Sequence, residues 1–251
     1  MEKPSRSLQT LNIVTVVVMA VSLALVFFYA PQEVTMGAVQ RIFYWHVPSA
    51  WMSFAAFAVT ALTGVIYLIT RRRAWDMLSR ASVEIGLVFT LMTIVSGSIW
   101  ARPAWNTWWT WDPRLTTYTI MALIYVAYLM LRQGLEDPER AARFAAIYGL
   151  VGFVSVPITW FSIRWWRTIH PVIIGNGSAT AEGGFDMTRS MLLVFLFCNL
   201  AFPVLYACFL ANRVRLERLQ ERVELLKARL AASEGEPYAA AAAAPRHPEY
   251  R

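Results

Sequence analysis

The sequence predicts an all-α, polytopic membrane protein with six transmembrane helices, on three observations. Apolar residues make up 57% and charged residues 16% of its 251 positions, whereas a soluble domain has about 45–50% apolar and about 25% charged residues. The apolar residues are gathered into six long blocks. Basic residues and tryptophans are divided unequally between the loops that join these blocks.

Each apolar block is close to the roughly 20 residues that a helix needs to cross about 30 Å of hydrocarbon. Backbone groups find no water there, so each block is expected to be a helix. Together the blocks form one membrane domain, residues 1–211. The predicted spans are residues 11–30, 49–70, 84–101, 115–131, 142–163 and 190–211.

Beyond the sixth span, apolar residues recur at spacings of three and four, which predicts a cytoplasmic amphipathic helix over residues 212–232. Two heptads do not distinguish a helix that faces a partner from one that covers the protein itself. Residues 233–251 are rich in alanine and proline and are predicted to be a disordered tail. The apolar positions of the amphipathic helix are Leu216, Leu219, Val223, Leu226 and Leu230.

The basic residues predict the orientation. Among the Lys and Arg residues up to position 218, twelve fall on one side of the predicted membrane and six on the other. The positive-inside rule then places both termini in the cytoplasm and the loops 31–48, 102–114 and 164–189 outside. Ten of the eleven tryptophans lie in the outer half, and only Trp75 is on the inner side. An aromatic belt populates both interfaces, so it does not explain this asymmetry alone.

Several classes of function are not supported. Cys198 and Cys208 share one apolar block without a C-x-x-C motif, so dithiol chemistry and covalent haem attachment to this chain are unsupported; both thiols are expected to be buried. No Walker A, H-E-x-x-H or G-x-S-x-G motif indicates ATP hydrolysis or another independent catalytic activity. The net charge of +7 reflects topology and anionic lipid, and no nucleic-acid motif accompanies it.

The stretch WNTWWTWD at residues 105–112 holds four of the tryptophans. As a helix it would be an outward-facing amphipathic segment in the membrane plane, with most of its large side chains on one face. Either interfacial anchoring or a platform for a large, flat, apolar ligand would explain it. The shared face would carry Trp105, Trp108, Trp109 and Asp112, and Trp111 would point elsewhere.

Asp112 is followed by Pro113 and then by the fourth span. Aspartate at the N-cap with proline at the first helical position is a strong helix-start signal. We therefore expect Asp112 to fix the direction in which the chain leaves the tryptophan segment.

Two histidines lie in the outer loops, His46 before the second span and His170 after the fifth. Each has tryptophans beside it and a proline soon after it. Two neutral imidazoles are a natural axial set for haem iron, while a tolerated interfacial polar residue is the simpler interpretation of each. Basic side chains of the same loops are either ordinary loop charges or partners for carboxylates such as haem propionates. They are Arg41, Arg102, Arg114, Arg164 and Arg167.

At these residues the chain resembles a known family. WNTWWTWDPRLT resembles the tryptophan-rich WWD signature of the haem-handling membrane proteins of cytochrome c maturation, and RIFYWHVPSAW, GLVFTLMTIVSGSIWARPAW and WWRTIHP resemble matching segments. The resemblance covers roughly residues 8–211, and the six spans fit the haem exporter members better than the larger ones. Asn106 stands where the family usually has glycine.

The resemblance implies a function. It implies that the WWD segment, Trp105, Trp108, Trp109, Trp111 and Asp112, is a periplasmic haem platform on the bacterial inner membrane. It also implies that His46 and His170 are axial ligands of transiently bound haem b. The implied partners are a membrane-anchored periplasmic haem chaperone, an ABC ATPase subunit, a second membrane subunit and a small single-span subunit. The chain would assist covalent attachment of haem to a chaperone histidine.

Other functions remain as alternatives. A quinol-linked cytochrome b subunit would carry histidines within its spans, and this chain has none there. A membrane transporter would carry intramembrane charges or broken helices, and the predicted membrane cores lack charge apart from Glu84 at a helix end. An assembly scaffold without its own haem site would use the tryptophans as an anchor only.

Overall fold

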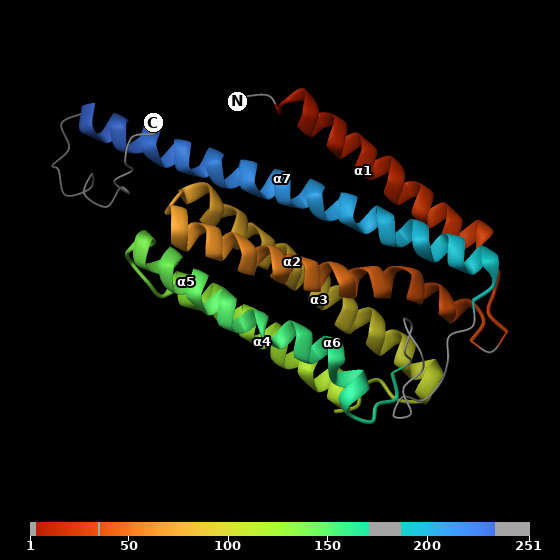
Figure 1. Cartoon of the computed structure of the whole chain (residues 1–251). Coiled ribbons are helices and arrows are strands. Elements are labelled where there is room, and N and C mark those ends of the chain that lie inside the picture. Colours follow the sequence, from red (N-terminus) through yellow and green to blue (C-terminus); the bar gives the residue numbers. More distant parts are fainter. Residues whose placement is uncertain (1–3, 35, 171–186, 234–251) are drawn as a thin grey trace.

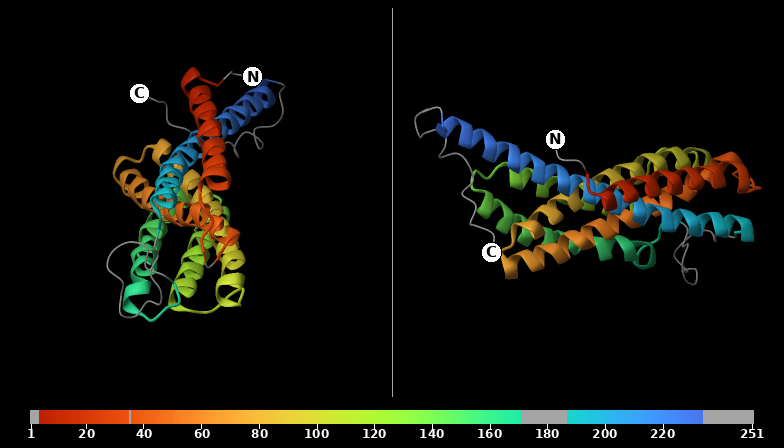
Figure 2. Two further views of the ribbon diagram at one scale, coloured as in Figure 1. Left: turned by 90° about the vertical axis from the view of Figure 1, so that its right-hand side faces the viewer. Right: turned by 90° about the horizontal axis from the view of Figure 1, so that it is seen from above.

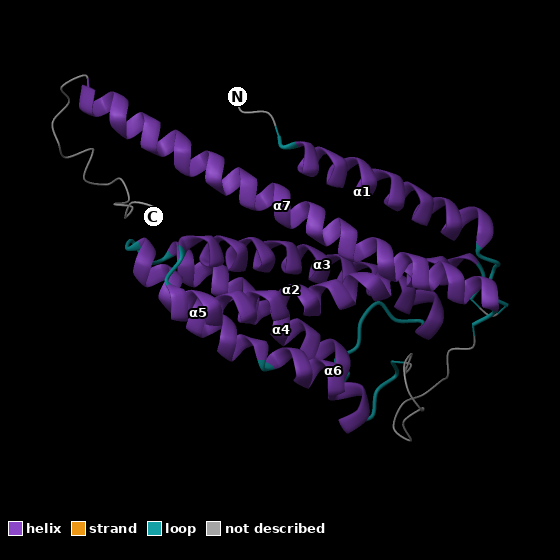
Figure 3. Cartoon of the chain, turned by 45° about the horizontal axis from the view of Figure 1, so that its top comes forward, coloured by secondary structure: helices purple, strands orange, loops and turns teal. Residues whose placement is uncertain are grey.

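A computed structural model describes residues 4–34, 36–170 and 187–233. Within these residues the chain consists of helices joined by short connections, with no β-strand (Figure 3). This confirms the predicted all-α class. The predicted tail at 234–251 and much of the predicted outer loop before Arg189 lie outside the described residues.

Six helical runs are long and apolar enough to cross a membrane, which confirms a multi-pass membrane protein. Three of the runs are composite. A π-helical turn extends the first helix, a 3-10 turn precedes the second, and the fifth run consists of two helices. The helices are α1 (Arg6–Ala24, continued by the π turn Leu25–Tyr29), α2 (Phe43–Thr70, preceded by the 3-10 turn Ala38–Ile42), α3 (Arg73–Trp105), α4 (Pro113–Gln133), α5 (Pro138–Phe153), α6 (Ser155–Trp165) and α7 (Arg189–Ser233).

Prolines account for the start of two helices and for one break. Both α4 and α5 begin with an Asp–Pro pair, in which the aspartate side chain accepts hydrogen bonds from backbone N–H groups of the first turn. The break between α5 and α6 lies at Val154. Pro157 explains it, because proline has no N–H and its ring displaces the carbonyl group four residues earlier. In contrast, α7 continues through Pro203 without a break.

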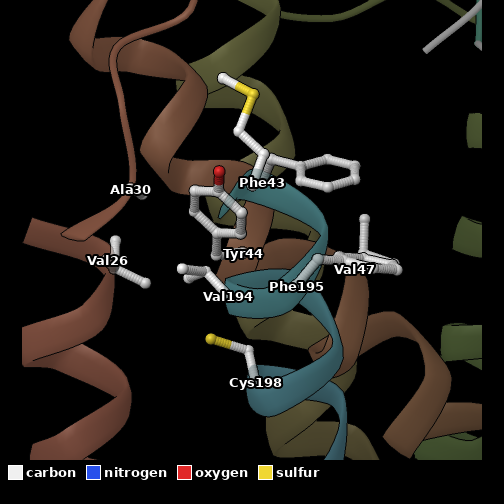
Figure 4. Close-up of a cluster of buried hydrophobic side chains, with 9 residues drawn as sticks. Val26, Ala30, Phe43, Tyr44, Val47, Val194, Phe195 and Cys198 are labelled. Atoms are coloured by element: carbon white, nitrogen blue, oxygen red, sulfur yellow. The ribbon is translucent and has the colours of Figure 1, made fainter. Parts of the chain in front are cut away.

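The helices form three groups (Figures 1 and 2). The hairpin of α2 and α3 is central, α4 to α6 pack on one side of it, and α1 pairs with α7 on the other. A buried cluster joins α7 to the central hairpin, where the rings of Phe43 and Phe195 stack at 5.1 Å (Figure 4). Cys198 lies in this cluster. Cys198 and Cys208 are both buried free thiols, as predicted.

The connections from α1 to α2 and from α3 to α4, together with the end of α6, lie at one end of the molecule (Figure 1, right). The α2–α3 and α4–α5 connections lie at the other end, where α7 continues past the body (Figure 1). The described parts of the three segments predicted to face outward are therefore gathered at one end, which we call the WWD end.

Candidate functional site

The tryptophan stretch is not a helix, so the predicted single helical face is wrong. The helix α3 ends at Trp105, and the chain from Asn106 to Asp112 is irregular. Asn106 has φ 54°, the left-handed conformation that commonly ends a helix and that asparagine tolerates. The Arg102 guanidinium donates to both the backbone oxygen and Oδ1 of Asn106 at 2.8 Å. These end signals, with the new helix start at Asp112, interrupt the helix on both sides of the tryptophan stretch.

The loop closes over a pocket between α2, α3, α4 and α6. Its cavity volume is about 120 Å³. Ligand pockets typically have mostly apolar walls with a few polar groups. Indole and imidazole rings form much of the lining here. The polar and aromatic lining residues include His46, Trp51, Trp100, Trp105, Trp108, Trp109, Arg114, Trp160, Arg164 and His170.

The pocket brings together seven of the twelve predicted site residues and leaves five outside, among them Arg167. Trp111 is 73% exposed and touches Trp109 edge to face at 5.6 Å. Arg41 lies over the ring of Phe27, 5.7 Å from its centre. Arg102 holds the end of α3, as described above. Asp112 does not line the pocket but bonds to a residue that does. The seven residues in the lining are His46, Trp105, Trp108, Trp109, Arg114, Arg164 and His170.

His46 is held by the facing helix α3. Its Nδ1 lies 3.0 Å from Ser96 Oγ. The ring rests against Gly97, where a Cβ atom would be only 2.9 Å from His46 Cε1. On another side lies Trp100, with 6.2 Å between ring centres. Neighbours on α3 therefore fix both the position and the rotation of this imidazole.

His170 is held by the carboxylate that starts α4. Its Nδ1 lies 3.3 Å from Asp112 Oδ2, and the Thr168 hydroxyl donates to the same oxygen at 2.6 Å. The other carboxylate oxygen accepts from Leu115 N at 2.8 Å, so the predicted N-cap is confirmed. Burial raises the pKa of Asp112, but hydrogen bonds from His170, Leu115 N and Thr168 outweigh it and lower the pKa to about 2. Asp112 is therefore ionised at neutral pH.

Arg114 brings a partly buried positive charge to the pocket. Its guanidinium donates to the carbonyl oxygen of Thr159 and packs over the ring of Phe54, 5.6 Å from its centre. Among the described residues, no carboxylate lies within ion-pair distance of Arg114. Taking a cation even partly out of water is costly without a counter-charge, so this end of the pocket favours an anionic group.

Other pocket residues were not predicted as site residues. Trp51 and Trp160 meet edge to face at 5.1 Å between α2 and α6, and Trp100 contacts both Trp105 and His46. All three tryptophans belong to the group in the outer half of the predicted membrane, and this position was the sequence signal that could have identified them as site residues. Ser96 is 50 positions from His46, and no local pattern indicates that they meet.

The fold and this pocket define a class: a multi-pass membrane protein with an indole-walled pocket that contains two imidazoles and a guanidinium. A family model described as "Heme exporter protein C" matches residues 1–229. A heme exporter protein C of Bradyrhizobium diazoefficiens is 35% identical over 226 residues, 89% of this chain and 83% of that protein. Those of Escherichia coli K12 (38% identity, 70% of each chain) and Paracoccus denitrificans (30% identity, 80% and 83%) are also similar. The chain belongs to the heme exporter protein C family.

Proposed function

We propose that this protein binds haem b in the pocket at the WWD end, with His46 and His170 as axial iron ligands, and presents it to a periplasmic haem chaperone during cytochrome c maturation. One observation carries the proposal. Two histidines from distant parts of the chain line one aromatic pocket, and each uses Nδ1 for a hydrogen bond within the protein. Nε2, the nitrogen that commonly binds metals, is left for a ligand.

The residues of the pocket fit haem in three further respects. Indole faces suit a large flat π-system. The ring centre of Trp105 lies 5.5 Å from that of His170 and 5.7 Å from that of Trp100, the indole that contacts His46. The buried Nε1 of Trp100 has no hydrogen-bond partner among the described residues. Arg114 supplies a guanidinium for a propionate.

Haem supplies the reactive vinyl group when it is bound, and the chain positions it. The inner tryptophans would cover the macrocycle and exclude water, while Arg114 would hold its acidic edge. Trp108 of the pocket lining and Trp111, three residues further along the same loop, are 58% and 73% exposed, and we propose that the chaperone contacts them. The family resemblance supports work with an ABC ATPase subunit, a second membrane subunit and a small single-span subunit. It also supports the bacterial inner membrane as the location.

The absorption spectrum of the purified protein tests the proposal. We expect the wild-type protein, purified in detergent from haem-replete cells, to show a six-coordinate haem spectrum. His46→Ala and His170→Ala should each lose one ligand, with a shifted Soret band and weaker haem retention. The third histidine, His247, lies outside the described residues, and His247→Ala is the matched control. A wild-type protein without haem would favour a scaffold or a transporter, and two alanine variants with unchanged spectra would refute the ligand assignment.

Site-directed labelling tests the orientation. We propose that both termini are cytoplasmic and that the WWD end is periplasmic. A cysteine introduced at Thr107 should react in intact cells with a thiol reagent that does not cross the membrane. The native thiols are both buried, so they add little background. A cysteine at Asp137, in the connection at the other end of the molecule, should stay unlabelled. The reverse labelling pattern would invert the proposed orientation.

A further inference from the structure

The two imidazoles of the pocket are held by chemically different groups. His46 Nδ1 contacts a neutral hydroxyl group, that of Ser96, and His170 Nδ1 contacts the carboxylate of Asp112. The hydrogen-bond partner of the ring nitrogen that does not bind the metal, here Nδ1, sets the tautomer of a histidine and its strength as a metal ligand. Different partners can therefore make the two rings iron ligands of different strength.

The proton of His46 can be placed from the contacts of Ser96. The Ser96 hydroxyl donates to the carbonyl oxygen of Met92 at 2.6 Å, within its own helix. A hydroxyl has one hydrogen and two lone pairs, so Ser96 Oγ is left to accept from His46. The proton of the ring is thus on Nδ1, and the lone pair of Nε2 is free.

His170 has the same tautomer for a different reason. An ionised carboxylate can only accept hydrogen bonds, so His170 Nδ1–H donates to Asp112. The loop that carries this histidine is tied down as well, because His170 N donates to Thr168 Oγ1 at 3.2 Å and Thr168 donates to Asp112. Both rings are therefore prepared to use Nε2.

The strength of the two hydrogen bonds differs. The contact to Asp112 is the longer one, 3.3 Å against 3.0 Å. Its acceptor carries a full negative charge, however, and charge-assisted hydrogen bonds are roughly twice as strong as neutral ones. A carboxylate also pushes electron density into the imidazole and makes Nε2 a better donor to iron.

We infer that Ser96 and Asp112 are positioning residues that make the two imidazoles unequal ligands: His170 is the stronger iron ligand, and His46 is the first to give way to a competing ligand. This inference rests on the proposed haem site and adds an order in which its ligands release. Release at the His46 side would leave haem held by His170 beside the exposed mouth of the pocket.

The apoprotein tests the hydrogen-bond arrangement without haem. In ¹⁵N-histidine-labelled protein in detergent, both rings should show protonated Nδ1 and unprotonated Nε2. Ser96→Ala should change the signals of His46 only, and Asp112→Asn those of His170 only; asparagine still serves as an N-cap. The controls are Ser49→Ala, whose hydroxyl bonds within α2, and Asp137→Asn, at the Asp–Pro start of α5. They should leave both signals unchanged. A protonated Nε2 on either ring in the wild type would overturn the inference.

Haem titration tests the inequality. Asp112→Asn should weaken haem binding about 10- to 100-fold, and Ser96→Ala only about 2- to 10-fold, while the two controls bind as the wild type does. His170→Ala should lose more affinity than His46→Ala. On reduction, carbon monoxide should displace His46, so the wild-type complex should match the infrared spectrum of the His46→Ala complex.

The outcomes separate this inference from the proposed function. A wild-type protein without haem overturns both. A haem-bound wild type whose carbon monoxide complex matches that of His170→Ala overturns the inference and leaves the haem site in place. Equal losses of affinity in Ser96→Ala and Asp112→Asn do the same.

Discussion

Gly97 shows at the scale of one residue how closely α3 approaches a pocket histidine. The His46 ring lies where a side chain at this position would be, because a Cβ atom would come within 2.9 Å of Cε1. Contacts that short are repulsive, and His46 sits in the rigid helix α2. Glycine is required here by space and not by its backbone conformation.

We expect Gly97→Ala to displace the His46 ring and to weaken haem binding. Overpacking of this kind costs about 1–3 kcal/mol, which corresponds to an affinity loss of roughly 5- to 150-fold. Haem titration and the position of the Soret band measure it. Gly134→Ala is the matched control, since its nearest neighbour would be 3.6 Å from the new Cβ atom. Equal affinities of the two variants would show that the His46 ring can move at no cost.

At the scale of an element, the connection between α3 and α4 shapes the mouth of the pocket. Its two ends are fixed by different means, a left-handed residue at Asn106 and the capped helix start at Asp112. The first places Trp105 at the end of α3 beside His170, and the second holds His170 itself. The conformation of a short loop thus decides where two of the site residues lie.

Asn106 is therefore expected to tolerate glycine but not a β-branched residue. The left-handed conformation costs a residue with a Cβ atom about 1–2 kcal/mol. Asn106→Val should lower the free energy of unfolding by about that amount relative to Asn106→Gly, and both variants lose the side-chain contact with Arg102. Thermal unfolding in detergent measures the difference. Equal stability of the two variants would mean that the loop relaxes to another conformation.

The elements were predictable where the signal is local. Six apolar blocks must be six helices because lipid offers the backbone no hydrogen bonds. The WWD stretch was mispredicted because its tryptophan spacing also fits a helix, and the end signals at Asn106 and Asp112 outweigh that periodicity. The contacts of His46 with Ser96 and of His170 with Asp112 could not be predicted, since they depend on which helix ends meet in the bundle.

At the scale of the whole molecule, the helices that build the pocket are clamped at their other end. Asp76 on α3 is 2% exposed and accepts from Arg73 Nη1 and from Arg132 Nη2 of α4, each at 2.9 Å. Arg73 also donates to Glu221 on α7 at 3.0 Å, and Arg213 of α7 donates to Glu84. The network ties the extension of α7 to the same two helices whose opposite ends carry the WWD loop.

We expect Asp76→Asn to destabilise the whole bundle. Removing one partner of a buried ion pair leaves an uncompensated charge and costs about 3–5 kcal/mol. The matched control is Glu224→Gln, which breaks the Lys227 pair on α7, where both side chains are more than 60% exposed. That change should cost about 0–1 kcal/mol. Melting temperatures of the purified proteins in detergent measure both effects.

Because the bundle is held at both ends, the Asp76→Asn protein should also lose haem at a lower temperature than the wild type, although Asp76 does not line the pocket. Equal melting temperatures of the two variants would show that the network contributes no more than a surface pair, and that the pocket depends on the packing of its own end alone.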